Sequence, residues 1–575
     1  MNVALEAIQF NHDQTSATTD AFNIRRNETE PVILPEWRRG ASVLPEHSPA
    51  AYAIRETRGH ILTIKAKFRS TDATDHKIRV RAVQARAERR QALGCSPLSF
   101  LLRLFSPVQS VRRGNILGAV KERQIEFDAT GETGYETFEL QDVELWRAGI
   151  SVSNTEWRWQ FRAKPSDHWT DFALTRHRIY TVLGIPGCPW EQTPYNDGNT
   201  QLPWADALEF ACDWAAGAHD PDDAASIVTQ NIYDLGLRGV IYSGSPFYSC
   251  PNFNCTEFLD LLRGGMNAAS MMNCSDCATA VSSFANLAGC NLRQLQLGPS
   301  DFQTKPIKLL GFPQESPDEF LGHEVAWKGN VTEDGQLFDA CLQVDGDDQP
   351  EAPPFVALLP ANIPFGRTGE KHYRFRLSPD LFLKPDTLSC RKIGYSVEGD
   401  CRHLDPSLLG FLKLRYDYAA WSNLAPQVRL PSVDYDFLAS QLLPEWTLKL
   451  PVQQPKFAGS IKAFQSLWLF PADTEVLVRL DLAEWKTSHE AREFMLRELG
   501  EFHLLRRVKR LSHPPIGDVS FVEAGDVSIL FARSQLVFLV RSAGRKPIPV
   551  RQIATGIDKL LVERTSTRVT GENEF

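Results

Sequence analysis

Three residues near the middle of the chain, Cys274, His323 and Asp339, have the types and the order that thiol catalysis requires. A cysteine at the start of a helix, followed along the chain by an imidazole and a carboxylate, can place a nucleophile, its base and the group that orients the base within hydrogen-bond reach. Such a set attacks an amide or ester carbonyl and forms an acyl-enzyme, which water or an amine then resolves. We therefore take these three as the candidate catalytic residues.

The residues that follow Cys274 predict an amphipathic helix that ends at Gly289. Small and apolar residues, Cys277 among them, recur at spacings of three and four on one face, while polar residues take the other. Cys274 lies at the N-terminal end, where unpaired N–H groups and the helix dipole favour thiolate over thiol and can bind an oxyanion. Three upstream residues can also reach the site: Tyr248, Asn252 and Asn254.

His323 and Asp339 fall on two predicted strands that form a hairpin. Residues alternate in character over 323–327 and over 337–344, and the residues between them suit a turn. Asp339 points away from the apolar face of its strand. A register that sets His323 opposite Asp339 brings both side chains to one face, where the carboxylate can hold the imidazole in one tautomer.

This segment, from about Ala225 to Val344, resembles the catalytic core of the transglutaminase-like superfamily, the papain-like core of cysteine proteases and acyl transferases. The resemblance is carried by Cys274-x-Asp276-x-Ala278, by Gly289 fifteen residues after Cys274, and by the hairpin with histidine before aspartate. It implies that Cys274, and not Cys277, is the nucleophile. It also implies an α+β core, for which we expect no cofactor and no metal.

The main functional hypothesis is a transglutaminase-like cysteine protease or amidase that acts on a protein or peptide substrate. Two alternatives share this fold: a catalytically silent scaffold that binds a protein partner, and an acyl transferase that cross-links protein glutamine. A structural zinc site is a third alternative, because the paired cysteines have nearly the usual ligand spacing in Cys250-x4-Cys255 and Cys274-x2-Cys277. Zinc would leave the order of His323 and Asp339 unexplained.

Around this core the sequence predicts a multidomain α+β protein. Residues 1–48 show little periodicity and are expected to form a flexible arm. Residues 49–190 alternate between apolar and polar, as at 62–68 and 157–162, which predicts a β-sandwich domain, interrupted by a helix or long insertion at 86–113.

The core with a C-terminal extension is expected at 191–450, beginning with helices over 204–218 and 222–235. Residues 451–575 predict a small α+β accessory domain. Its expected strands are 476–482, 527–531 and 536–541, and its expected helices are 488–499 and 550–562. The flanking domains would position the substrate or bind a protein partner.

Composition limits the remaining function classes. A net charge of −9, with 43% hydrophobic and 23% charged residues, fits a globular protein and gives no basic field for nucleic acid or anionic membrane. The first residues lack a secretory signal, and no apolar run has the roughly 18 residues that suggest a spanning helix. The eleven cysteines are an odd number, spread thinly, so we expect mostly reduced thiols and a cytoplasmic protein.

Overall fold

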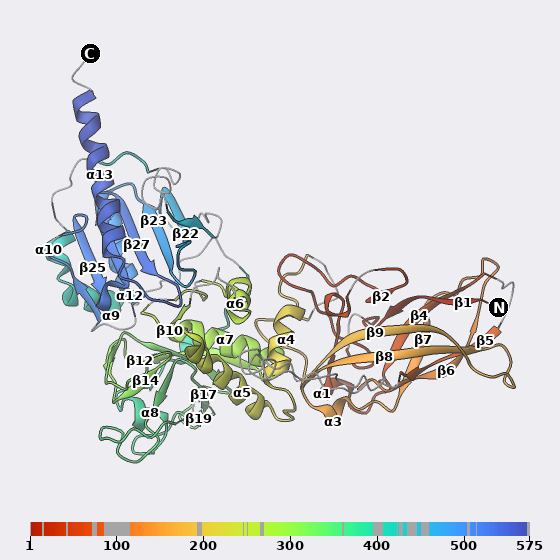
Figure 1. Ribbon diagram of the computed structural model, residues 1–575. Helices are drawn as coiled ribbons and strands as arrows, with labels where there is room; N and C mark the ends of the chain where they lie inside the picture. Colours follow the sequence, from red (N-terminus) through yellow and green to blue (C-terminus); the bar gives the residue numbers. More distant parts are fainter. Residues whose placement is uncertain are drawn as a thin grey trace, which may run out of the picture. The chain divides into compact units, whose positions relative to one another are not determined.

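A computed structural model describes the chain from residue 2 to residue 571 except for residues 14–16, 42–43, 72–76, 86–115, 193–197, 245, 250, 265–269, 359–361, 395–405, 423, 425–428, 434–444, 450–458, 503–506 and 513–514. The expected helix or insertion at 86–113 therefore lies outside the described residues. The chain is a mixed α+β protein with several sheets (Figure 1). It forms two compact units, one made of Met1–Val228 and Ser282–Leu292 and the other of Thr229–Val281 and Arg293–Phe575.

The N-terminal unit is built on a nine-stranded sheet. In spatial order the strands are β2 (Trp37–Arg38), β1 (Val3–Gln9), β4 (Thr63–Ser70), β7 (Glu136–Gln141), β6 (Ala119–Glu126), β5 (Lys77–Gln84), β8 (Ser151–Arg162), β9 (Thr170–Val182) and β3 (Ala50–Ala53). The pairs are antiparallel except for β3 with β9. Alternate residues of β4, β5 and β8 are buried, as their period of two predicts.

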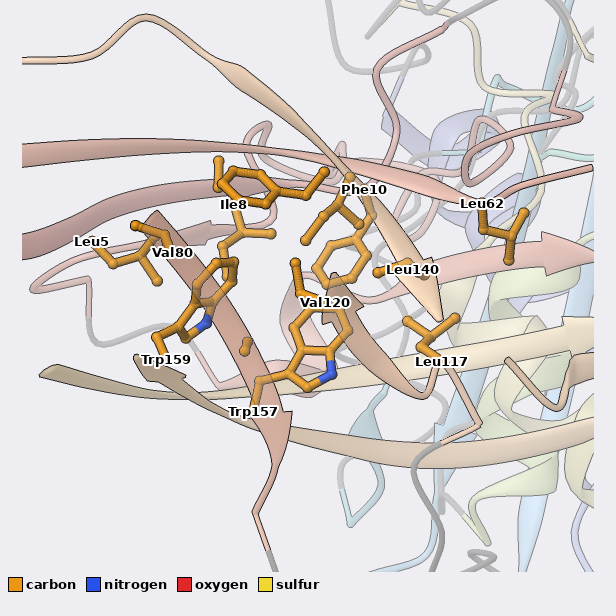
Figure 2. Packing of buried hydrophobic residues seen from close by; sticks show 14 of the residues in the cluster. Leu5, Ile8, Phe10, Leu62, Val80, Leu117, Val120, Leu140, Trp157 and Trp159 are labelled. Carbon is orange, nitrogen blue, oxygen red and sulfur yellow. The ribbon is translucent and has the colours of Figure 1, made fainter. Parts of the chain in front are cut away.

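The buried faces of these strands meet in one core. Trp157 and Trp159 of β8 lie among aliphatic side chains from β1, β5 and β6 (Figure 2). The ring of Phe10, just after β1, stacks on Trp157 with a centroid separation of 5.8 Å. The expected β-sandwich is thus a single continuous sheet, curled so that its own halves pack face to face.

The expectation of a flexible arm over residues 1–48 is wrong for residues Val3–Gln9. Residues Val3–Gln9 form β1, which lies inside the sheet between β2 and β4 and buries Leu5 and Ile8. The following turn is fixed by the buried Glu36 carboxylate, which accepts hydrogen bonds from the amides of Phe10 at 3.0 Å and Asn11 at 2.9 Å. These partners are distant in sequence, so local composition gave no sign of them.

The segment that carries the candidate residues contains helices and short strands. Helices α4 (Ala205–Trp214) and α5 (Pro221–Tyr233) appear where helices were predicted. A five-stranded sheet has the order β19 (Ile363–Pro364), β17 (Gln336–Phe338), β16 (His323–Lys328), β12 (Leu292–Gly298) and β20 (Phe382–Leu383). Beside it, β14 (Ile307–Leu309) pairs with β18 (Leu342–Val344). The parallel pair β10 (Ile241–Tyr242) and β11 (Met271–Met272) leads directly into α7 (Cys274–Leu287).

The C-terminal residues form a seven-stranded antiparallel sheet with helices on both faces (Figure 1). Its order is β21 (Thr447–Leu448), β22 (Lys462–Leu469), β23 (Leu477–Glu484), β27 (Leu536–Ser542), β26 (Ser528–Arg533), β25 (Val519–Glu523) and β24 (Val508–Arg510). The predicted helices are α12 (Ser488–Gly500) and α13 (Arg551–Gly571). Helices α9 (Pro406–Arg415) and α10 (Tyr418–Ser422) pack with α12. This part of the extension that was assigned to the core at 191–450 therefore packs on the C-terminal sheet.

Two further observations concern the cysteines and the helices. Cys188 and Cys390 are each disulfide-bonded, so the expectation of reduced thiols is wrong at these two positions, whereas Cys212, Cys277 and Cys341 are buried thiols. Sequence spacing could not show this, because a disulfide depends on which residues the fold brings together. Among the helices in the described part of the chain, none combines the length and apolar character needed to cross a bilayer.

Candidate active site

The start of α7 is fixed by a reciprocal cap around the candidate nucleophile. The Asn273 side chain accepts a hydrogen bond from the Asp276 amide at 3.0 Å, and the Asp276 carboxylate accepts one from the Asn273 amide at 3.1 Å. This is the arrangement of a capping box, with Asn and Asp in place of the usual residues. Cys274, the first helical residue, is fully buried. The residues around the thiol thus explain why the helix begins there.

Asp276 also ties a second segment to the helix start. Its carboxylate accepts hydrogen bonds from the amides of Phe247 and Tyr248 and from the Ser249 hydroxyl, each at 2.8 Å. Burial outweighs these donors and raises the pKa of Asp276. The predicted polar face of α7 is therefore not solvated, because Asp276, Thr279 and Asn286 are buried and hydrogen-bonded inside the protein.

The structure brings His323 and Asp339 together. The imidazole Nε2 lies 2.9 Å from the Asp339 Oδ2, and both side chains are buried. The predicted register is wrong, however, because the strand pairing ends at Ala326 with Phe338 and its extension would place Asp339 opposite Val325. Asp339 lies just beyond β17 and reaches His323 diagonally, which is possible because alternate residues of β16 share a face.

A third side chain, Tyr373, completes a triangle of hydrogen-bonding groups. Its hydroxyl donates to Asp339 Oδ2 at 2.5 Å and lies 3.0 Å from His323 Nε2. The other Asp339 oxygen accepts from the Cys341 amide at 2.9 Å. Burial acts to raise the pKa of Asp339, but His323 and these donors outweigh it and lower the pKa. The carboxylate is therefore held ionised and in one orientation.

The charge state of His323 follows from this environment. Burial disfavours the imidazolium, but the Asp339 carboxylate and then the Cys274 sulfur outweigh burial and raise the pKa of His323 to about 10. The Nδ1 atom has no nitrogen or oxygen partner within the described ranges, and the Cys274 sulfur acts on the ring as a hydrogen-bonding neighbour. With Nε2 committed to Asp339, Nδ1 is the ring nitrogen left to exchange a proton with the Cys274 thiol.

Tyr242 is a second hydroxyl close to the nucleophile. It ends β10, where its backbone is in register with Met272 of β11, two residues before Cys274. Its buried hydroxyl has no nitrogen or oxygen partner in the part of the chain that is described, and the Cys274 sulfur is its hydrogen-bonding neighbour. Burial and then the Cys274 sulfur raise its pKa well above the usual range. A neutral hydroxyl held beside the sulfur is a potential hydrogen-bond donor to an oxyanion.

Arg391 and Glu324 link the helix to the strand that carries His323. Arg391 pairs with the Glu324 carboxylate through both terminal nitrogens, one at 2.8 Å, and donates to the Thr279 hydroxyl on α7 at 3.0 Å. Glu324 follows His323 directly in β16. This largely buried ion pair connects the elements that carry the thiol and the imidazole.

His323 and Asp339 lie in direct contact, and several of their partners were not identified from the sequence. Tyr242, Tyr373, Glu324 and Arg391 are common residue types without a motif, and only the fold shows their role. Among the three upstream residues proposed to reach the site, Asn254 is used instead as the N-cap of α6 (Cys255–Leu262).

The alternative of a zinc site at the paired cysteines finds no such grouping among the residues that can be placed. Within the described ranges, the one group with metal-ligand spacing contains His323, Asp339 and Cys341, whose ligand atoms lie within 4.8 Å of one another. It includes neither Cys255 nor Cys277, and Cys250 lies outside the described residues. The direct contact between His323 and Asp339 already satisfies the two groups without an ion.

No protein-family model and no curated protein matches this chain. Among solved structures, the crystal structure of red sea bream transglutaminase matches with 11% sequence identity over 94% of this chain and 80% of that chain, at a TM-score of 0.31. A likeness at this level adds nothing to the functional assignment, which has to be made from the geometry of the site.

Proposed function

We propose that the chain is a cysteine hydrolase of transglutaminase-like type, a protease or amidase, with Cys274 as nucleophile, His323 as acid and base, and Asp339 as the group that orients His323. The observation that carries this proposal is the commitment of His323 Nε2 to Asp339 at 2.9 Å, which leaves Nδ1 for the thiol. Burial raises the pKa of the neighbouring thiols Cys277 and Cys341 well above the usual range, which disfavours their thiolates.

In the proposed reaction the imidazolium of His323 favours the thiolate of Cys274. The sulfur attacks an amide carbonyl carbon, and the resulting oxyanion takes hydrogen bonds from the Tyr242 hydroxyl and from a backbone amide at the start of α7. The His323 Nδ1 proton passes to the leaving amine as the carbon–nitrogen bond breaks, which leaves a thioester. Water, deprotonated by Nδ1, then attacks the thioester and releases the acid and the Cys274 thiolate.

One observation favours the alternative of a silent scaffold. Cys274 and His323 have no exposed surface, so a substrate carbonyl reaches the sulfur only after a neighbouring segment moves. A scaffold would stay closed, whereas an enzyme would open often enough for turnover. The two proposals therefore differ in the reactivity of Cys274 under native conditions.

The test compares two thiols that are equally buried. Cys212 on α4 is fully buried, and burial raises its pKa well above the usual range. The protein would be treated with iodoacetamide between pH 5.5 and 9.5, and alkylation of each cysteine followed by peptide mass spectrometry. We expect Cys274 to react at least about tenfold faster than Cys212 at pH 7, and this preference to vanish in His323→Ala. Equal rates at the two thiols would favour the scaffold.

A further inference from the structure

Tyr373 is the residue in the site that no catalytic pattern required. It is the first residue of α8 (Tyr373–Leu377) and is almost completely buried. Its ring lies nearly parallel to the His323 imidazole, with 12° between the planes and 6.4 Å between the centroids. Its hydroxyl touches both members of the His–Asp pair, at 2.5 Å from Asp339 Oδ2 and 3.0 Å from His323 Nε2.

The three contacts allow one arrangement of protons when Asp339 is ionised. A carboxylate only accepts, so the Tyr373 hydroxyl hydrogen must point at Asp339. The hydroxyl oxygen then turns a lone pair toward His323 Nε2, which must carry a hydrogen to face two acceptors. A neutral His323 with its proton on Nδ1 would set the Nε2 lone pair against both oxygens. The carboxylate and the hydroxyl together thus exclude the tautomer in which Nδ1 cannot accept a proton from the thiol.

Helix α8 is held so that this hydroxyl stays in place. The Arg376 guanidinium donates to the backbone carbonyls of Asp345 at 2.8 Å and Asp347 at 2.6 Å, just beyond β18. At the end of α8, the Leu377 carbonyl accepts from the Lys305 amide at 2.9 Å. The element that carries Tyr373 is therefore tied to the strand that follows Asp339 in sequence.

We propose that Tyr373 is a positioning residue of the thiol site, which fixes the orientation of Asp339 and the tautomer of His323 through its hydroxyl. This inference rests on the proposed function, because positioning of the base matters only if the base serves the thiol. Without the hydroxyl, Asp339 Oδ2 keeps His323 as its sole side-chain donor among the described contacts. The carboxylate then becomes easier to protonate, and the imidazolium loses its partner at higher pH.

The variant Tyr373→Phe removes only the hydroxyl and keeps the buried ring. We expect the acid limb of the pH profile for alkylation of Cys274 to move upward by about one pH unit, which slows alkylation by about tenfold at a pH on that limb. The melting temperature should change little. The matched control is Tyr52→Phe, which removes a buried hydroxyl in the N-terminal unit that has no described hydrogen-bond partner. It should leave the rate and the pH profile unchanged.

A double-mutant cycle shows whether Tyr373 acts through Asp339. In an Asp339→Asn background the effect of Tyr373→Phe on alkylation should fall to less than about threefold, because the group it positions is already lost. An equal effect in both backgrounds, or an unchanged pH profile in the single variant, would overturn the inference.

A separate readout keeps this inference apart from the proposed function. In protein labelled with nitrogen-15 histidine, we expect a downfield proton on His323 Nε2 in the wild type that shifts in Tyr373→Phe. If Cys274 proves no more reactive than Cys212 while this proton shifts, the enzyme is refuted and the positioning role of Tyr373 stands. If the proton does not shift, Tyr373 has no positioning role, whatever the reactivity of Cys274.

Discussion

Replacing Asp339 by asparagine removes one charge from the buried site and leaves its shape nearly unchanged. The Cys341 amide donates to the Oδ1 position at 2.9 Å, so the asparagine carbonyl oxygen is expected to take that position. The amide nitrogen then takes the position of Oδ2 and donates toward His323 Nε2, which lies 2.9 Å away. His323 would have to accept there and carry its proton on Nδ1. In that tautomer it cannot take a proton from Cys274.

The size of the effect follows from the pKa of His323. The site raises this pKa from 6.5 to about 10, and Asp339 is the first of the groups that oppose burial. The difference of about 3.5 pH units corresponds to roughly 3,000-fold in the protonation equilibrium of His323, or about 5 kcal/mol. Asp339 and Cys274 together contribute more than this net difference, because burial acts against them. We expect alkylation of Cys274 at pH 7 to fall on the order of 10²-fold to 10³-fold.

The assay is the iodoacetamide experiment, with Cys212 as an internal reference and the melting temperature as a check on folding. In the wild type, the rate at Cys274 should stay nearly level across neutral pH, because the imidazolium keeps its proton up to about pH 10. In Asp339→Asn the rate should climb with pH like that of an ordinary thiol. A folded variant whose Cys274 reacts within about threefold of the wild type, with the same level profile, would refute the reasoning.

Three further outcomes are expected. The folded state raises the pKa of His323 above its ordinary value of 6.5, so the contribution of His323 to stability is complete below pH 6.5 and is lost as pH rises through about 10. The free energy of unfolding, measured in urea, should therefore fall by at most about 5 kcal/mol over that window. This fall should be absent from His323→Gln. Arg391→Met leaves Glu324 without its partner and should cost about 3 kcal/mol in the same assay, partly restored by adding Glu324→Gln. Asp276→Asn removes charged acceptors and should speed amide hydrogen exchange at 247–248 by about tenfold or more, whereas an unchanged exchange rate would contradict the tie seen there.

Sequence periodicity predicted the elements whose residue pattern depends on near neighbours along the chain. Strand β8 buries Trp157 and Trp159 on one face, as its alternation indicated. Helices α7 and α12 begin at residues whose side chains cap them, at Asn273 and Thr487. These features depend on neighbours within four residues along the chain, so the sequence alone contains them.

The features that were missed depend on partners far away in sequence. Strand β1 has only seven residues, and it became part of the sheet because β4 and β2 pair with it on both sides. The amphipathic pattern of α7 could not show whether its polar residues meet water or protein, because the same residue types serve both. Their actual partners include Arg391 and the segment 247–249, which no local pattern connects to the helix.

The residues of the candidate site likewise divide into those that the sequence identified and those that only the fold revealed. Cys274, His323 and Asp339 could be selected because nucleophile, base and orienting acid need particular residue types in a workable order. Tyr373 and Tyr242 need only a hydroxyl at a particular point, which many folds could supply from any element. The Tyr373 hydroxyl, 2.5 Å from Asp339, supports the carboxylate that favours one tautomer of His323. This contact also stabilises a buried ion pair, so the reactivity of Cys274 in Tyr373→Phe, and not the contact itself, separates the enzyme from the scaffold.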